Sequence, residues 1–329
     1  MTNTSIHLYG GGWVLDQCLC YLQTLHTNVL PVVVTSSRLI SSFSNHTTLA
    51  SAGSIYICNE ITDYINLLSS SDVLPPSFII ACGPDTGFSE ELLAKVKYGV
   101  YSLHPVSSDR YLGGAHETWQ ILNNENETGY SIQQINSSID GSQNPFIRST
   151  YTPLLASDTP ESIHKKNNVI GYELLTSLIR ELLVNPSPPC YSALKKEITY
   201  SLVWPRLNTV ANGWINWNWS TSHIIQFLKA FGAPYPGAST FFDNSLVRLD
   251  YIETIDNCQF HPYSSGVIVQ AFHDISQVLV VTLDGIILLK YYLNDDNTAI
   301  PQPGYRFITP IDHLEGSLQI PIVSAYTKT

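Results

Sequence analysis

The sequence predicts an α/β fold, with a parallel sheet in its N-terminal part and a second, β-rich domain after it. The first sign is a strand, glycine turn, helix and strand in succession at the start of the chain. The second is a run of strand patterns separated by turn residues towards the end. The third is size and composition, because 329 residues with 44 % apolar and 13 % charged side chains can form the cores of two domains.

The opening of the chain reads as one βαβ unit. Ile6–Tyr9 is a short apolar strand, Gly10–Gly12 is a turn, apolar residues from Val14 to Leu25 recur with helical spacing, and Val29–Val34 is a buried strand. The glycine turn could cradle a phosphate, although tight turning alone explains it because the pattern is not GxGxxG. Two further strands are predicted at Ser54–Cys58 and Ser77–Cys82.

A long helix closes the N-terminal part. Thr159 is a suitable N-cap, Pro160 suits the first helical position, and apolar residues follow along one face. Pro186–Pro189 cannot continue a helix, so we expect it to end there. The domains predicted from this boundary are residues 1–190 and 191–329.

Strand signals dominate the C-terminal part, where Asp284-Gly285 is a turn. We therefore expect a small β-barrel or sandwich. The predicted strands are Ser245–Tyr251, Gly266–Ala271, Gln277–Thr282 and Ile286–Tyr292.

The charge balance bears on partners. The chain has 16 basic and 27 acidic residues, a formal net charge of −11, and its basic residues form no run longer than a pair. Because binding to a phosphate backbone needs clustered positive charge, we expect no nucleic-acid partner.

Location and metal binding are predicted from patterns that the sequence lacks. The opening residues show no basic stretch followed by an apolar one, and no apolar run is long enough to span a membrane, so we expect a cytoplasmic protein without a membrane partner. The six cysteines lack CxxC spacing, which favours reduced core thiols. No histidine has ligand spacing, so no metal site is expected.

Five short segments in the first half of the chain carry a family resemblance. They are Tyr101–Pro105, Arg110–Gly113, Trp119–Asn123, Glu127–Gly129 and Ile139-Asp140. Their order and spacing resemble the folate-dependent formyltransferases, which include methionyl-tRNA formyltransferase and the formyltransferases of nucleotide-linked amino sugars. His104 and Asp140 lie 36 positions apart, as the family's His and Asp do.

A second group of segments resembles the junction into the family's C-terminal domain. These segments are Asn212–Trp217, His223–Ile225 and Ala233–Thr240, and the last contains Pro-Tyr-Pro-Gly-Ala. The resemblance implies a Rossmann-like formyltransferase domain followed by an OB-like β-barrel. It also implies 10-formyltetrahydrofolate as co-substrate and a small-molecule primary amine as acceptor, and it is closer to the amino-sugar members than to the tRNA members.

The resemblance assigns three catalytic residues. His104 would polarise or deprotonate the amine, and Asp140 would orient the imidazole ring or take the proton. Ser102 falls where the family has an Asn that binds the formyl oxygen, and a hydroxyl can donate one hydrogen bond there.

The donor pocket is assigned to a loop and one apolar residue. The loop is Cys82, Gly83, Pro84 and Asp85, at the place where the tRNA enzymes have an apolar loop that holds the pterin, and Ile139 precedes the aspartate. Part of that contact is made by backbone groups, which a change of side chain leaves in place.

Three functions remain open from the sequence. The first is formyl transfer to a small-molecule amine, such as a nucleotide-linked amino sugar or a biosynthetic amine. The second is a repurposed enzyme with another donor or reaction at the His104/Asp140 site, and the third is a relative that only binds a ligand or partner. A homo-oligomer is compatible with each.

Overall fold

The structure is a computed structural model. It describes residues 4–25, 29–43, 54–70, 73–84, 87–105, 112–113, 115–136, 146–185, 203–293 and 299–319.

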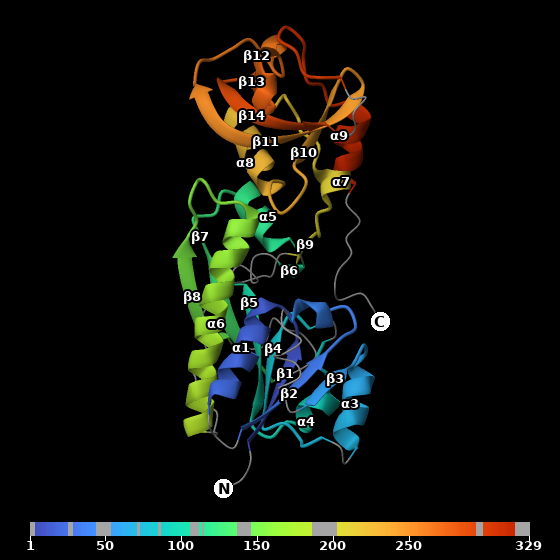
Figure 1. The fold of residues 1–329 in the computed structure, drawn as a ribbon, viewed down its shortest axis with the longest axis vertical. Helices are drawn as coiled ribbons and strands as arrows, with labels where there is room; N and C mark the ends of the chain where they lie inside the picture. The colour runs from blue at the N-terminus through green and yellow to red at the C-terminus, as the bar shows by residue number, and fades with distance from the viewer. Residues whose placement is uncertain are drawn as a thin grey trace. The chain divides into compact units, whose positions relative to one another are not determined.

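A seven-stranded sheet forms the centre of the N-terminal part (Figure 1). The strands lie side by side in the order β3-β2-β1-β4-β5-β7-β8. The first five of this order pair in parallel, and β7 pairs antiparallel with β5. The four predicted N-terminal strands are confirmed, with ends shifted by one or two residues. The strands are β1 (Thr4–Gly10), β2 (Val29–Thr35), β3 (Ser54–Ile57), β4 (Phe78–Cys82), β5 (Gly99–Pro105), β7 (Glu127–Ile135) and β8 (Phe146–Pro153).

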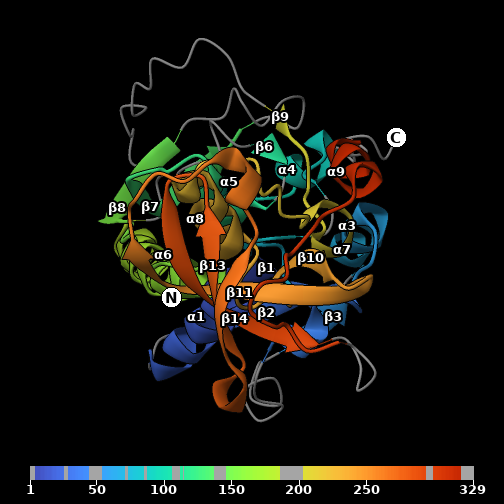
Figure 2. The same cartoon turned by 90° about the horizontal axis from the view of Figure 1, so that it is seen from above.

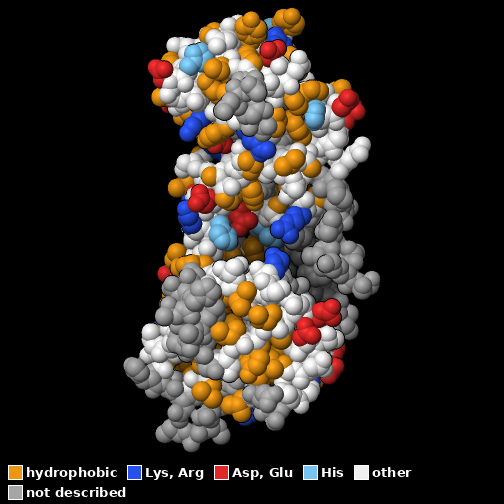
Figure 3. Space-filling model, turned by 45° about the vertical axis from the view of Figure 1, so that its right-hand side comes forward, with side chains coloured by type: hydrophobic (Ala, Val, Ile, Leu, Met, Phe, Trp, Pro, Cys, Tyr) orange, Lys and Arg blue, Asp and Glu red, His pale blue; other side chains and the backbone are white. Residues whose placement is uncertain are grey.

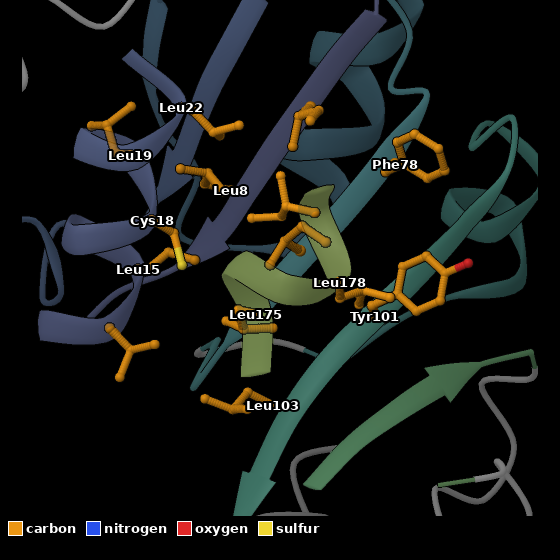
Figure 4. Packing of buried hydrophobic residues seen from close by; sticks show 14 of the residues in the cluster. Leu8, Leu15, Cys18, Leu19, Leu22, Phe78, Tyr101, Leu103, Leu175 and Leu178 are labelled. Carbon is orange, nitrogen blue, oxygen red and sulfur yellow. The ribbon is translucent and has the colours of Figure 1, made fainter. Parts of the chain in front are cut away.

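Helices cover both faces of this sheet. The predicted first helix is confirmed as α1 (Trp13–Thr24), and together with α6 (Pro160–Val184) it packs on one face, while α3 (Ile61–Ser69) and α4 (Glu90–Ala94) pack on the other. Figure 4 shows Leu15, Cys18 and Leu19 of α1 gathered with Leu8 of β1 and with Leu175 and Leu178 of α6. Burying each such leucine contributes about 1.5–3 kcal/mol, so this core fixes the sheet on which the site is built.

The start of α6 follows the predicted capping. The Ser162 N–H donates to the Thr159 hydroxyl at 3.3 Å, and the Thr159 N–H donates to the Ser162 hydroxyl at 3.0 Å. Pro160 is the first helical residue, where a missing N–H costs no intrahelical hydrogen bond.

A five-stranded antiparallel sheet, in the order β10-β11-β14-β13-β12, forms the C-terminal part, and its four predicted strands are confirmed. A short segment reaches both edge strands, because Ile308 exchanges backbone hydrogen bonds with Phe241 and the Ile268 N–H donates to the Tyr305 carbonyl at 2.9 Å. This antiparallel sheet is consistent with the predicted barrel or sandwich. The strands are β10 (Ala238–Phe242), β11 (Ser245–Asp256), β12 (Ile268–Phe272), β13 (Gln277–Thr282) and β14 (Gly285–Leu293).

One helix packs into this sheet. Figure 1 shows α8 (Thr221–Ala230) against β11, and Figures 1 and 2 show α7 (Thr209–Asn212) beside α9 (Ile311–Leu318). The remaining short elements are η1 (Ile40–Ser42), β6 (Leu112–Gly113), α5 (His116–Leu122), β9 (Val203–Trp204), η4 (Pro262–Ser264) and η5 (His273–Ile275).

The chain divides into two compact units. Unit 1 comprises Met1–Asp109, Glu127–Thr152 and Lys165–Ser201, and unit 2 comprises Arg110–Asn126, Pro153–His164 and Leu202–Thr329. The predicted boundary between residues 1–190 and 191–329, with its proline run, lies outside the described residues and stays a prediction.

Four of the five described cysteines follow the sequence prediction, and Cys190 lies outside the described residues. Cys18 and Cys58 are buried, Cys20 and Cys82 are partly buried, and all are free thiols. Cys258 is exposed, so the expectation of core thiols is wrong at this position, which lies in the turn after β11. Among the helices in the described part of the chain, none is both long and apolar enough to cross a membrane.

Candidate functional site

Strand β5 carries two of the three predicted catalytic residues. Its sequence, Gly-Val-Tyr-Ser-Leu-His-Pro, alternates between the two faces of the sheet, and Tyr101 and Leu103 belong to the core on the α1 face. Ser102 and His104 therefore share the opposite face, which α3 and α4 cover, with Cα atoms about 7 Å apart. The structure thus brings these two predicted residues together.

The two side chains differ in exposure. Ser102 is only 1 % exposed and is paired with Ala81 of β4 and Gln133 of β7. His104 is partly buried, pairs with Ser131, and is the second-last residue of its strand. Because parallel sheets bind ligands at the carboxyl ends of their strands, His104 stands where this fold places its ligands.

Two loops meet at this same edge of the sheet. The Gly11 N–H, after β1, donates to the Cys82 carbonyl, at the end of β4, at 3.0 Å. Gly10 has a φ of 112°, and a methyl group there would lie 2.2 Å from the same carbonyl oxygen. The glycine turn is therefore required by the close approach of the two loops. The Gly12 N–H, at the start of α1, donates to the Ser42 hydroxyl at 2.7 Å.

Three residues of the predicted donor loop, Cys82, Gly83 and Pro84, lie in the described part of the chain. The Cys82 side chain packs on the α1 face, opposite to Ser102 and His104, and burial raises the pKa of its thiol to about 12. Gly83 is exposed and has a φ of 51°, and among the described residues none lies within 4 Å of where a Cβ on Gly83 would stand. The role of this loop in holding a donor stays a prediction.

Three predicted site residues lie outside the described residues. They are Asp85 of the donor loop, Ile139 and Asp140. Their assigned roles stay predictions, as does the pairing of Asp140 with His104.

The end of β5 is held in place by α6. Gly171 lies in the middle of that helix, and a methyl group there would come within 2.8 Å of Leu103 and 3.1 Å of Tyr130. The missing side chain lets the helix approach the strand closely, which fixes the backbone that presents His104.

The sequence reasoning missed a group of titratable side chains in unit 2. His164 of α6 lies 3.7 Å from the Glu117 carboxylate of α5, and His116 precedes Glu117. The contact with Glu117 raises the pKa of His164, whereas burial lowers the pKa of His116. Burial acts to raise the pKa of Glu117, but the contact with His164 and the charge of the nearby histidines leave it lowered. The adjacent His116-Glu117 pair, just after Gly113, was the available sequence signal.

The described residues contain no group of three or more His, Cys, Asp or Glu side chains that could hold a metal ion. This finding covers only that part of the chain.

The fold and the site define an α/β protein with a histidine at the carboxyl edge of a parallel sheet, followed by an antiparallel domain. Residues 208–301 match the family model described as "Formyl transferase, C-terminal domain". The methionyl-tRNA formyltransferase of Citrifermentans bemidjiense is 26 % identical over 55 % of this chain and 54 % of its own length. That of Clostridium tetani is 27 % identical over 66 % of each chain.

Solved structures show the same fold. An N-formyltransferase from Helicobacter canadensis, in complex with folinic acid and dTDP-3-aminofucose, has a TM-score of 0.61 at 18 % identity and covers 89 % of this chain and 100 % of its own. A 4-N formyltransferase from Francisella tularensis has a TM-score of 0.59 at 15 % identity and covers 77 % of this chain and 99 % of its own. The parallel-core sheet fits the Rossmann-like domain of these proteins.

These matches confirm the resemblance to the folate-dependent formyltransferase family that the sequence motifs carry. The chain spans between about half and two thirds of the length of the two tRNA formyltransferases. What it transfers, and to which acceptor, is therefore taken up as a proposal.

Proposed function

We propose that this protein transfers a formyl group from 10-formyltetrahydrofolate to the primary amine of a small molecule, such as a nucleotide-linked amino sugar or a biosynthetic amine. The observation that carries the proposal is the position of His104 at the carboxyl edge of the sheet, on the face it shares with Ser102, in a chain that matches this family.

The reaction sets the tasks of the site. The formyl carbon exchanges its bond to the donor nitrogen for a bond to the amine, the amine loses a proton, and the donor nitrogen gains one. His104 would polarise the formyl group or take the amine proton, and Asp140 would orient its ring or accept that proton. Ser102 would donate its hydroxyl to the formyl oxygen.

A folate-type donor is supported by the similar structures and by the loop after β4. The Helicobacter canadensis protein was solved with folinic acid. In this chain, no described residue lies within 4 Å of a Cβ position on Gly83, and the Cys82 side chain packs into the core; both favour a donor held by the backbone of Cys82–Pro84. By resemblance, Asp85 and Ile139 would contribute to the same pocket.

A small acceptor is favoured over a nucleic acid by the distribution of charge. On the face in Figure 3, the described Lys and Arg side chains are interspersed with Asp, Glu and uncharged side chains, and no broad blue patch appears. The net charge of −11 would also weaken attraction to a phosphate backbone. The similar structure with dTDP-3-aminofucose suggests an amino-sugar acceptor.

We further propose that residues 191–329 form an OB-like barrel domain and residues 1–190 the catalytic domain, in a cytoplasmic protein. Support for the barrel comes from the Tyr305–Ile308 segment, whose backbone hydrogen bonds reach both edge strands of the five-stranded sheet.

A repurposed site is the second candidate, and the burial of Ser102 favours it. Ser102→Asn restores the family's residue and separates the two. Formyl transfer that rises in a folded variant supports the proposed reaction with a weakened oxygen contact. Formyl transfer that stays absent in both forms, with intact folding, favours another donor or reaction, and ligand binding without turnover leaves only a binding protein.

The direct experiment incubates the protein with 10-formyltetrahydrofolate and a panel of nucleotide-linked amino sugars and small amines. Formation of tetrahydrofolate and of a formylated amine, detected by mass spectrometry, is the expected result. No formylated product from any amine, with the donor bound, would contradict the proposal.

A further inference from the structure

A pocket of about 310 Å³ has all of its described lining residues in unit 2. It has three walls. The first is the turn after α5, and the second is the loop before α6. The third is the face of α8 that carries Gln226 and Lys229. These two residues lie three positions apart and therefore on one side of the helix. Ile163 of α6, fully buried, forms the floor.

The walls are held in position by hydrogen bonds. The Leu154 N–H donates to the Asn126 carbonyl at 2.9 Å, which joins the first two walls. The Asp158 carboxylate accepts from the Leu155 N–H and the Ser162 hydroxyl, each at 2.7 Å, and is 6 % exposed. The Asp158 carboxylate therefore holds the second wall, the loop before α6, in its conformation.

Among the described lining residues, Lys229 carries the positive charge. Lys229 is partly buried, its Nζ donates to the Ala156 carbonyl and lies 4.7 Å from the centre of the Tyr251 ring, and burial lowers its pKa. An ammonium group has three donors, so an anion in the pocket would regain for Lys229 part of the solvation it has lost. The neighbouring amide of Gln226 can donate to the same anion.

The other polar groups restrict the kind of anion. Asn124, Asn126 and the Glu125 carboxylate line the first wall, and with Asp158 they give the pocket two negative side chains against one positive. A polyanion such as a pyrophosphate would be repelled, whereas hydroxyl groups would donate to these carboxylates and amides. Leu154 and the 59 % exposed Leu155 supply apolar contact for a carbon skeleton.

We propose that this pocket binds a small hydroxycarboxylic acid, with its carboxylate on Lys229 and its hydroxyls on the Asn124–Asn126 turn. The volume lies at the lower end of the range of ligand pockets and suits a molecule the size of a monosaccharide. The site is independent of the formyl-transfer reaction, since it uses none of the residues assigned to that reaction.

The test uses glucuronate as the probe, and glucose as the same ring without the carboxylate. Calorimetry should show one saturable site for glucuronate and weaker binding of glucose. Lys229→Met should weaken glucuronate binding about tenfold or more, because a charge-assisted hydrogen bond is lost, and should leave glucose binding unchanged.

Two further variants keep the result interpretable. Lys290→Met is the matched control, since Lys290 also lies over a tyrosine ring, 5.2 Å from the centre of Tyr292, but outside the pocket, and it should bind glucuronate like the parent protein. Ala156→Trp, which narrows the pocket at its exposed rim, should abolish binding while the thermal midpoint stays near that of the parent.

Three outcomes would overturn the proposal. They are equal affinity for glucose and glucuronate, glucuronate binding that survives both Lys229→Met and Ala156→Trp, and no glucuronate binding at the highest soluble concentration.

Discussion

The Gly11 N–H donates to the Cys82 carbonyl at 3.0 Å, and this hydrogen bond joins the turn after β1 to the loop after β4. The two segments are 71 positions apart in the sequence. Sequence patterns marked the first as a glycine turn, and the family resemblance marked the second as the donor loop. Their contact joins the turn and the donor loop at the carboxyl edge of the sheet. His104 lies at the same edge, on β5, which pairs with β4.

The close approach predicts unequal effects of alanine at two glycines. Gly10→Ala would place a methyl group 2.2 Å from the Cys82 carbonyl oxygen and should lower the free energy of unfolding by about 3 kcal/mol or more. Gly83 also has a positive φ, of 51°, but no described residue lies within 4 Å of the added methyl group, so Gly83→Ala should cost only about 1–2 kcal/mol. Urea denaturation measures both, and equal losses would contradict the role given to Gly10.

The packing of α6 on β5 predicts a second contrast. Gly171→Val would push against Leu103 and Tyr130, and should cost about 1–3 kcal/mol and lower formyl transfer by displacing the end of β5. Gly316→Ala in α9, where nothing lies within 4 Å, should instead stabilise the protein by about 0.5–1 kcal/mol. Thermal unfolding and turnover of both variants check this. Unchanged stability in Gly171→Val would rule out the close contact.

Buried His7 predicts a loss of stability in mild acid. Its Nδ1 lies 2.7 Å from the Tyr64 hydroxyl and its Nε2 3.1 Å from the Leu74 carbonyl, and burial lowers its pKa from 6.5 to about 4. Between these two pH values, His7 is protonated in the unfolded chain and neutral in the folded protein. The stabilisation is complete above pH 6.5 and is lost as the pH falls towards 4, by about 3 kcal/mol.

Urea denaturation between pH 7 and pH 4 measures this loss, with His7→Gln as the comparison. The variant should be less stable at neutral pH, and its stability should depend less on pH across this window. Parallel pH profiles for the two proteins would show that His7 is not the titrating group.

The start of α8 predicts a second loss of stability in acid, this time from a carboxylate, that of Asp284. The Thr221 N–H donates to Asp284 at 2.6 Å and its hydroxyl contacts the same carboxylate, and these hydrogen bonds lower the pKa of Asp284 below 3.8. Its stabilisation is present above pH 3.8 and is lost as the pH falls through the lowered pKa. Asp284→Asn should thus be less stable than the parent at neutral pH, and the difference should narrow below pH 3.8. A constant difference would contradict this.

The site predicts that His104 is required for turnover. Loss of a positioned acid–base group should lower the rate of formyl transfer by about 100- to 10,000-fold in His104→Ala, and Asp140→Ala should do the same. His223→Ala, at an exposed histidine of α8, is the control and should keep full activity. Folded His104→Ala protein with normal turnover would remove the mechanism.

The sequence predicted four of the seven strands of the N-terminal sheet, β1 to β4, because strands buried on both faces are apolar runs such as Val29–Val34. It did not predict β5, β7 and β8. The Thr-Gly segment at the start of β7 was recognised only through the family, because this strand buries Thr128, Ser131 and Gln133, and buried polar residues give no alternating pattern.

The sequence assigned Ser102 and His104 to one site through the family resemblance alone. The structure adds that both lie near the end of β5, two positions apart and so on one face. It did not show that the Cys82 thiol turns to the opposite face, because that depends on the register of β4. The pocket beside Lys229 also escaped it, because its walls come from loops about 30 and 100 positions apart and no local pattern joins them.

The most direct test of the central claim is calorimetric binding of 5-formyltetrahydrofolate, a stable analogue of the donor, to the protein and to His104→Ala. The account predicts saturable binding at one site in both, with formyl transfer lost only in the variant. Absence of binding to the folded parent protein at millimolar ligand would contradict a folate-type donor and leave the His104 site to another reaction.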